Sequence, residues 1–115
     1  MNLLQSIFGP PMPSVSAAEL NEKMKQPKRP LVLDVRQPEE FRTGHIIGAK
    51  LIPLGELGRR LNELPKDKEI VCVCASGSRS SSATKMLMRA GYNAVNMKGG
   101  MFTWSHAGLS MKKGG

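Results

Sequence analysis

The residues with the clearest chemical potential lie near the middle of the chain, around Cys74. The preceding run 70–73 is apolar and β-branched, which predicts a buried parallel strand. Residues 79–90 carry apolar side chains at helical spacing and stop before Gly91, which predicts a helix. Cys74 is therefore expected at the carboxyl end of a strand, facing the amino terminus of a helix.

That position would favour the thiolate form of Cys74. The N–H groups of a first helical turn have no partner within the helix, and the helix dipole places partial positive charge there. Small loop residues let successive N–H groups surround one point. Thiols at helix amino termini can have pKa values of ~3.5–7.5, against ~8.5 for free cysteine. The loop residues expected to hold a substrate anion or a persulfide are Ala75, Ser76, Gly77, Ser78, Arg79 and Ser80.

The loop sequence CASGSRS, residues 74–80, resembles the active-site loop of single-domain rhodaneses, the thiosulfate:cyanide sulfurtransferases. The resemblance extends over about residues 14–107 in consistent order. Residues 34–54 (DVR, PEEF, GHI and IPL) are similar to the first signature of that family, and residues 91–104 (GY, GG and a tryptophan) to its second. The resemblance implies a rhodanese-like fold, sulfur transfer through a persulfide on Cys74, and no metal or organic cofactor.

The remaining elements indicate a scaffold of alternating helices and strands. A capping-box pattern at 16–19 begins a first helix, residues 31–35 form a second apolar strand, and Pro38 opens a short helix. Leucines at 54, 57, 61 and 64 predict one helical stripe, and residues 92–97 a last strand. This order predicts a three-layer α/β sandwich whose central, mainly parallel sheet of about five strands is flanked by helices. Ligands bind such sheets at the carboxyl ends of strands, where Cys74 stands.

The chain length of 115 residues indicates one domain, expected over residues 14–108. Residues 1–13 contain a proline-rich stretch and are expected to form an extended amino-terminal arm, and residues 109–115 a flexible tail. No apolar run approaches the ~20 residues of a membrane-spanning helix, and the amino terminus does not resemble a signal peptide. No membrane contact is therefore expected.

Cys72 and Cys74 are the only two cysteines. A disulfide between residues two apart would be strained, and free thiols fit a reducing compartment, so a cytoplasmic location is expected. Cys72 is interpreted either as a small buried residue or as a resolving thiol that takes sulfur from Cys74. Structural zinc is not expected, because only two histidines accompany this single pair.

The formal net charge of +8 admits three interpretations. The positive charge can keep the protein soluble, or it can attract small anions such as thiosulfate. Nucleic-acid binding is the third, and it is disfavoured because the basic residues are scattered and aromatic residues are few.

Three charged residues are candidates to support the site. Asp34, at the end of a predicted strand, needs a partner if it is buried. It is expected to pair with Arg36 or another arginine, and it can also orient Arg36 or Arg79 near the thiol. Arg79 either stabilises the anionic donor and persulfide or ties the loop to the scaffold through Asp34 or a backbone carbonyl. His45 is expected in a structural turn rather than as a catalytic base.

The mechanism expected is a double displacement with no separate base. The Cys74 thiolate takes the outer sulfur of thiosulfate, and cyanide or a thiol then removes it. Two alternatives stay open. One is a carrier module that accepts persulfide sulfur from a protein donor and delivers it to a partner. The other is a phosphatase or arsenate reductase, although their Cys-x5-Arg loop is one residue longer than the 74–79 loop.

Overall fold

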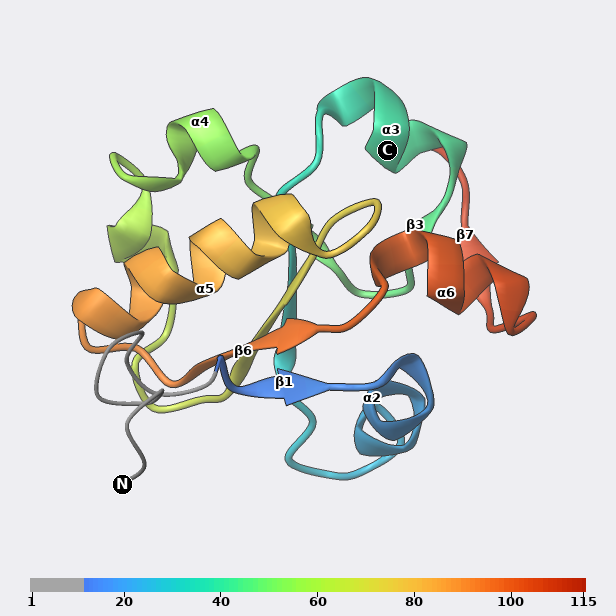
Figure 1. The fold of residues 1–115 in the computed structure, drawn as a ribbon, viewed down its shortest axis with the longest axis horizontal. Coiled ribbons are helices and arrows are strands. Elements are labelled where there is room, and N and C mark those ends of the chain that lie inside the picture. The colour runs from blue at the N-terminus through green and yellow to red at the C-terminus, as the bar shows by residue number, and fades with distance from the viewer. Residues whose placement is uncertain (1–11) are drawn as a thin grey trace, which may run out of the picture.

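A five-stranded sheet forms the centre of the computed structural model, which describes residues 12–115. Every pair of neighbouring strands is parallel. Most of the predicted arm, residues 1–11, lies outside the described residues. In spatial order the strands are β1 (Ser14–Val15), β6 (Ala94–Met97), β5 (Ile70–Val73), β2 (Leu31–Asp34) and β4 (Lys50–Leu51), with β1 beside β6 at one edge (Figure 1).

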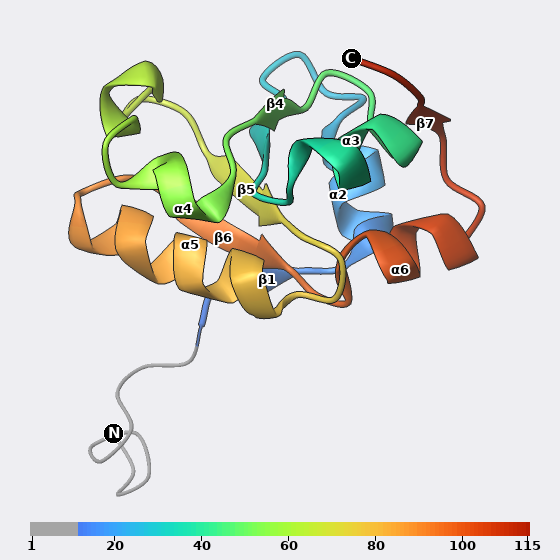
Figure 2. The same cartoon turned by 90° about the horizontal axis from the view of Figure 1, so that it is seen from above.

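Helices cover both faces of this sheet, as the view from above shows (Figure 2). On one face lie α4 and α5, and on the other α2 and α6, with a separate core beneath each pair. The helices are α2 (Ala17–Lys23), α3 (Pro38–Thr43), α4 (Leu54–Leu57), the 3-10 turn η1 (Leu61–Glu63), α5 (Ser78–Arg89) and α6 (Gly100–His106). This arrangement confirms the predicted three-layer α/β fold.

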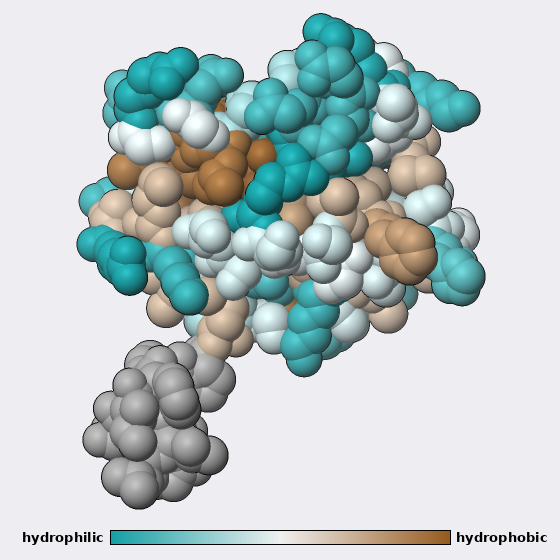
Figure 3. Space-filling model, turned by 45° about the horizontal axis from the view of Figure 1, so that its top comes forward, coloured by the Kyte–Doolittle hydropathy of each residue, from teal (hydrophilic) through white to brown (hydrophobic). Residues whose placement is uncertain are grey.

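The two cores arise from the alternation of side chains along each central strand. In β5, Ile70 and Cys72 face the layer of α4 and α5, whereas Val71 and Val73 face the layer of α2 and α6. All four residues are buried, which explains why this strand reads as a continuous apolar run. Figure 3 shows further apolar surface between α4 and α5, in the layer whose partly buried residues include Leu54, Leu61 and Met86.

The first helix begins as its sequence indicated. The Ser16 hydroxyl accepts a hydrogen bond from the Glu19 N–H at 3.0 Å, and the Glu19 carboxylate accepts one from the Ser16 N–H at 2.9 Å. These reciprocal bonds confirm the capping box and fix the start of α2 directly after β1.

The leucine stripe over residues 54–64 is not one helix, and that prediction was wrong. Helix α4 ends at Leu57, and the chain resumes a helical turn only in η1. Gly55 and Gly58 lower the helix propensity of this segment. The Arg60 guanidinium spans the break, contacting Glu56 at 3.0 Å and Glu63 at 2.7 Å, while Leu57 and Leu64 remain buried.

The segment predicted as a flexible tail instead contains a strand. β7 (Met111–Lys112) pairs in antiparallel fashion with β3 (His45–Ile46). The Trp104 indole N–H donates to the carbonyl of Ser110 at 3.1 Å, and the Gly114 N–H donates to the carbonyl of Arg42 at 2.9 Å. A strand of two exposed residues carries no hydrophobic pattern, which is why the sequence did not reveal it. Within residues 12–115, no helix combines the length and apolarity needed to cross a membrane.

Candidate active site

Cys74 directly follows β5, and α5 begins four residues later at Ser78. The chain turns between them at Gly77, whose φ of 109° lies in the left-handed region that favours glycine. Helix α5 therefore points its amino terminus back toward Cys74, as the sequence predicted. Of the loop residues, Ser76 and Ser78 are exposed, Ala75 and Gly77 are partly buried, and Ser80 is buried.

The Cys74 sulfur accepts hydrogen bonds from this turn. The Gly77 N–H lies 3.0 Å from Sγ, and the Ser80 hydroxyl lies 3.3 Å from it. Burial is the largest single influence on the pKa of Cys74 and raises it. The Ser80 hydroxyl and the N–H groups of Ser80, Gly77 and Ser76 together outweigh burial, so the pKa lies below the ordinary thiol value. The site can therefore hold negative charge on sulfur.

The amino terminus of α6 is hydrogen-bonded to the backbone of the Cys74 loop. The N–H groups of Met101 and Phe102 donate to the carbonyls of Cys74 and Ala75 at 2.8 and 3.0 Å. Gly100 lies against the same two carbonyls with a φ of 57°, and a Cβ there would collide with both oxygens. The tandem glycines at 99–100 therefore permit two chain segments to approach closely. Sequence reasoning noted this glycine pair only within the second family signature and did not identify these bonds.

Asn96 on β6 also supports the loop, and sequence reasoning did not select it. Its side-chain amide donates to the Gly77 carbonyl at 3.4 Å, a long hydrogen bond. Its Oδ1 is buried and has no hydrogen-bond partner among the described residues. A polar residue within an otherwise apolar strand is the signal that could have singled it out.

Arg79 pairs with a carboxylate that the sequence analysis did not consider. Its two terminal nitrogens contact the two oxygens of Glu40 at 2.7 and 2.8 Å. The expected tie through Asp34 or a backbone carbonyl was wrong, because the Asp34 carboxylate is already bound to Arg36. Arg79 lowers the pKa of Glu40 to about 2, and Glu40 raises the pKa of Arg79.

Asp34 and Arg36 form the ion pair that the sequence predicted. Arg36 Nε lies 2.9 Å from Oδ1 of Asp34, and Nη2 lies 2.8 Å from Oδ2. Arg36 Nη2 also donates to the Gly44 carbonyl at 2.8 Å. Both side chains are buried, so the pair joins the end of β2 to the start of β3.

His45 and Cys72 occupy structural positions. His45 Nδ1 lies 2.8 Å from the Phe41 carbonyl, and the imidazole stacks on the Phe41 ring at 3.6 Å. Burial raises the pKa of Cys72 to about 11, and the Thr84 hydroxyl offsets this only in part. Cys72 is therefore a neutral thiol packed beneath the helix layer.

A cavity of about 300 Å³ opens beside the loop at Ala75. Phe102 on its rim is 76 % exposed, although its own N–H is bonded to the loop. Ala75, the residue after Cys74, lines this cavity, whereas the Cys74 side chain itself is buried. The cavity is lined by Arg36, Thr43, Gly44, Ala75, Met101, Phe102, Ser105 and Met111. No group of three or more His, Cys, Asp or Glu side chains within residues 12–115 could hold a metal ion.

Comparisons with known proteins agree with this geometry. The Rhodanese-like domain family matches residues 16–107. A putative sulfurtransferase of Bacillus subtilis, YtwF, is 39% identical over 90 residues, covering 78% of this chain and 87% of that protein. A putative sulfur carrier protein of the same organism, YrkF, is 37% identical over 95 residues, covering 82% of this chain and 51% of that protein. The crystal structure of a rhodanese-related protein from Thermoplasma volcanium superposes with a TM-score of 0.82 at 36% identity, covering 87% of this chain and 97% of that one.

Proposed function

The chain belongs to the rhodanese-like domain family of sulfurtransferases, and we propose that it transfers sulfane sulfur from thiosulfate or a persulfide donor through Cys74. The acceptor is cyanide or a thiol. We propose a cytoplasmic location, because free cysteines are typical of a reducing compartment.

One observation carries this proposal: the Cys74 sulfur lies at the focus of donors from its own loop. The bonds from Gly77 and Ser80 stabilise negative charge on Sγ, which is the reactive form of a cysteine nucleophile. The same two groups can donate hydrogen bonds to Sγ when it is the inner sulfur of a persulfide. No separate base is needed, because the pKa of Cys74 is already lowered.

In the first half-reaction, the Cys74 thiolate attacks the outer sulfur of thiosulfate. A bond forms between Sγ and that sulfur, the bond inside thiosulfate breaks, and sulfite leaves with the electron pair. Arg79 is the cation proposed to stabilise the dianionic donor, which competes with Glu40 for its guanidinium. The Asp34–Arg36 pair stabilises the end of the adjacent strand β2. Cys74 then carries a persulfide anion.

In the second half-reaction, a nucleophile attacks the outer sulfur of the persulfide. Cyanide becomes thiocyanate, or a thiolate becomes a new persulfide. The bond to Sγ breaks, and the Cys74 thiolate is restored. No net oxidation or reduction of the protein occurs, and no cofactor takes part in either step.

A second candidate is a sulfur carrier that accepts persulfide sulfur from a protein and passes it to another protein. The similarity to a putative sulfur carrier protein favours it. So does the burial of Cys74, because a protein donor can rearrange the loop as it docks. The carrier would load from a persulfidated protein but not from thiosulfate.

The intact mass of the protein after incubation with thiosulfate tests the proposal. Wild type and Cys72→Ala should gain one sulfur atom that cyanide removes, whereas Cys74→Ser should gain none. Loading only from a persulfidated cysteine desulfurase would overturn the thiosulfate assignment in favour of the carrier. If neither donor loads Cys74, the sulfurtransferase proposal fails. Phosphate release from p-nitrophenyl phosphate would then favour the phosphatase alternative.

A further inference from the structure

A second cavity, of about 390 Å³, lies at the amino-terminal edge of the sheet. Arg29 and Leu31 line it at the start of β2, and Lys68 lines it two residues before β5. Ile47, from the turn between β3 and β4, closes another side. Since the strands of the sheet are parallel, their starts lie on the edge opposite Cys74. This cavity is therefore separate from the sulfur-transfer site.

Part of the wall of this cavity is apolar. Met24, Leu31 and Ile47 contribute to it from three different segments of the chain. Ile47 is 55 % exposed. Met24 and Leu31 are partly buried. An apolar body placed here would remove this surface from water.

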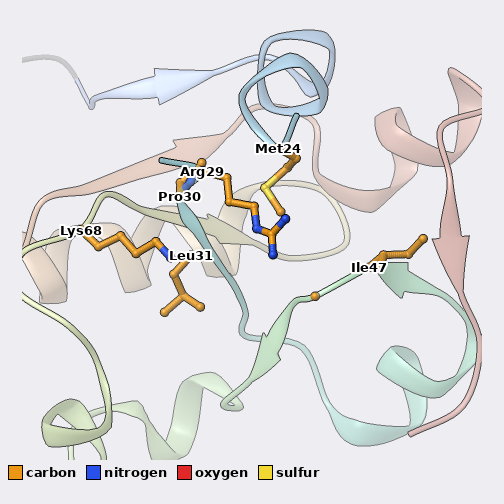
Figure 4. A pocket seen from close by; sticks show the side chains of 7 residues that line it. Met24, Arg29, Pro30, Leu31, Ile47 and Lys68 are labelled. Carbon is orange, nitrogen blue, oxygen red and sulfur yellow. The ribbon is translucent and has the colours of Figure 1, made fainter. Parts of the chain in front are cut away.

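Two cations border the same cavity. Figure 4 shows the Arg29 side chain reaching between Met24 and Ile47, and Lys68 extending toward Leu31. No carboxylate is among the lining residues described. Two nearby acids pair with other cations: Glu69, adjacent to Lys68, contacts Lys23 at 2.9 Å, and Glu22 contacts Lys25 at 3.1 Å. Asp67, the other neighbour of Lys68 in the sequence, is exposed and does not line this cavity. Across residues 12–115, neither Arg29 nor Lys68 makes a side-chain hydrogen bond or ion pair with another described residue.

We propose that this cavity binds a small organic anion, a carboxylate or phosphate carried on an apolar chain. The head group lies between Arg29 and Lys68, and the chain packs on Met24, Leu31 and Ile47. A guanidinium recognises both head groups through paired N–H donors, and an ammonium adds charge without strict geometry. The volume is at the lower end of the ~300–1,000 Å³ typical of small-molecule sites, which suits a single short chain.

Titration of the ¹⁵N-labelled protein, residues 1–115, with octanoate tests this inference by NMR. Saturable shifts are expected at the amides of Met24, Arg29, Leu31, Ile47 and Lys68. Octyl phosphate should compete for the same site. The neutral analogue 1-octanol should bind at least tenfold more weakly, and so should acetate, which lacks the chain.

Variants separate the charge contribution from the apolar one. Arg29→Gln with Lys68→Gln should weaken octanoate at least tenfold, because both charge contacts are lost. The matched control, Lys85→Gln with Lys113→Gln, makes the same change in net charge at two exposed positions and should leave affinity unchanged. Ile47→Ser should weaken octanoate and leave the weak binding of acetate unchanged. All variants should load sulfur on Cys74 as wild type does.

Four results would overturn the inference. They are an absence of saturable shifts, equal binding of 1-octanol, full affinity in the Arg29→Gln/Lys68→Gln variant, and shifts centred on Ala75 and Phe102. Co-sedimentation with phosphatidylglycerol vesicles without binding of octanoate would also overturn it, because the basic edge would then recognise a membrane surface instead.

Discussion

Glu40 and Arg79 form a two-point ion pair that joins α3 to the start of α5. The two contacts measure 2.7 and 2.8 Å, and each side chain is 35 % exposed. Glu40 also accepts a hydrogen bond from the Gln37 N–H at 3.0 Å, at the start of α3. One carboxylate therefore fixes the beginnings of two helices, and an anionic donor must compete with it for Arg79.

Replacing Glu40 by Gln should lower the free energy of unfolding by about 1 kcal/mol, because an ion pair that is one-third exposed is partly screened by water. The folded state lowers the pKa of Glu40 from 4.5 to about 2. The contribution of the carboxylate is therefore fully present above pH 4.5 and is lost as pH falls toward 2. Urea denaturation of wild type and variant at pH 7 and pH 3 should show a smaller difference at pH 3. The neighbouring Glu39→Gln serves as control, and an equal loss in that variant would contradict the assignment.

Asp34→Asn should be far more destabilising, by roughly 3–5 kcal/mol. It leaves the buried Arg36 guanidinium without its counter-charge. The control is Arg59→Gln, which alters an exposed pair with Glu56 and should cost less than about 0.5 kcal/mol. Guanidinium denaturation measures both. A loss below about 1 kcal/mol in Asp34→Asn would show that the pair does not act as a buried one.

Alkylation by iodoacetamide should distinguish the two cysteines of the folded protein. The pKa of Cys74 is lowered by its loop donors, whereas burial raises the pKa of Cys72 to about 11. Thiolate is the reactive form, so the rate at Cys74 should reach half its maximum at a lower pH than the rate of a free cysteine does. Cys72 should remain unmodified at pH 8. Peptide mass analysis locates the modification, and preferential labelling of Cys72 would contradict both assignments.

Ser80→Ala should move the alkylation profile of Cys74 to higher pH. The variant removes one hydrogen bond to Sγ, and a bond of ~0.5–1.5 kcal/mol corresponds to about half to one pH unit. Ser82→Ala alters an exposed hydroxyl on the same helix and should leave the profile in place. A shift of the same size in both variants would indicate a general effect on α5 rather than the bond to sulfur.

Gly100→Ala should disrupt the active-site loop. The new Cβ would collide with the carbonyls of Cys74 and Ala75, at a backbone conformation that alanine rarely adopts. A loss of more than about 2 kcal/mol in unfolding free energy is expected, together with loss of sulfur loading. Gly55→Ala, where the same methyl meets no atom within 4 Å, should be neutral or slightly stabilising. Normal loading by Gly100→Ala would show that α6 does not hold the loop.

Sequence alone identified the central strands because β2 and β5 are buried on both faces and so are almost uninterrupted apolar runs. The position of Cys74 followed directly from the end of β5. The pairing of Arg79 with Glu40 could not be predicted, because the two residues are 39 positions apart and meet only through the packing of α3 beside α5. The leucine stripe gave a wrong prediction because its local pattern was read without the tertiary structure. Its spacing was helical, yet only the fold shows that Leu57 and Leu64 reach the core from two separate turns.

Because β1 pairs with β6, the sheet can be completed only late in the synthesis of the chain. β1 is the first strand of the described chain, yet its only neighbour in the sheet is β6, with Ser14 opposite Asn96. A chain that emerges from the ribosome amino end first must hold this strand unpaired until β6 follows. The N–H groups of Met101 and Phe102, which fix the Cys74 loop, emerge later still. Long-range parallel pairing of this kind is slow to form, so the Cys74 loop is not fixed in its final position until the last elements of the domain have emerged.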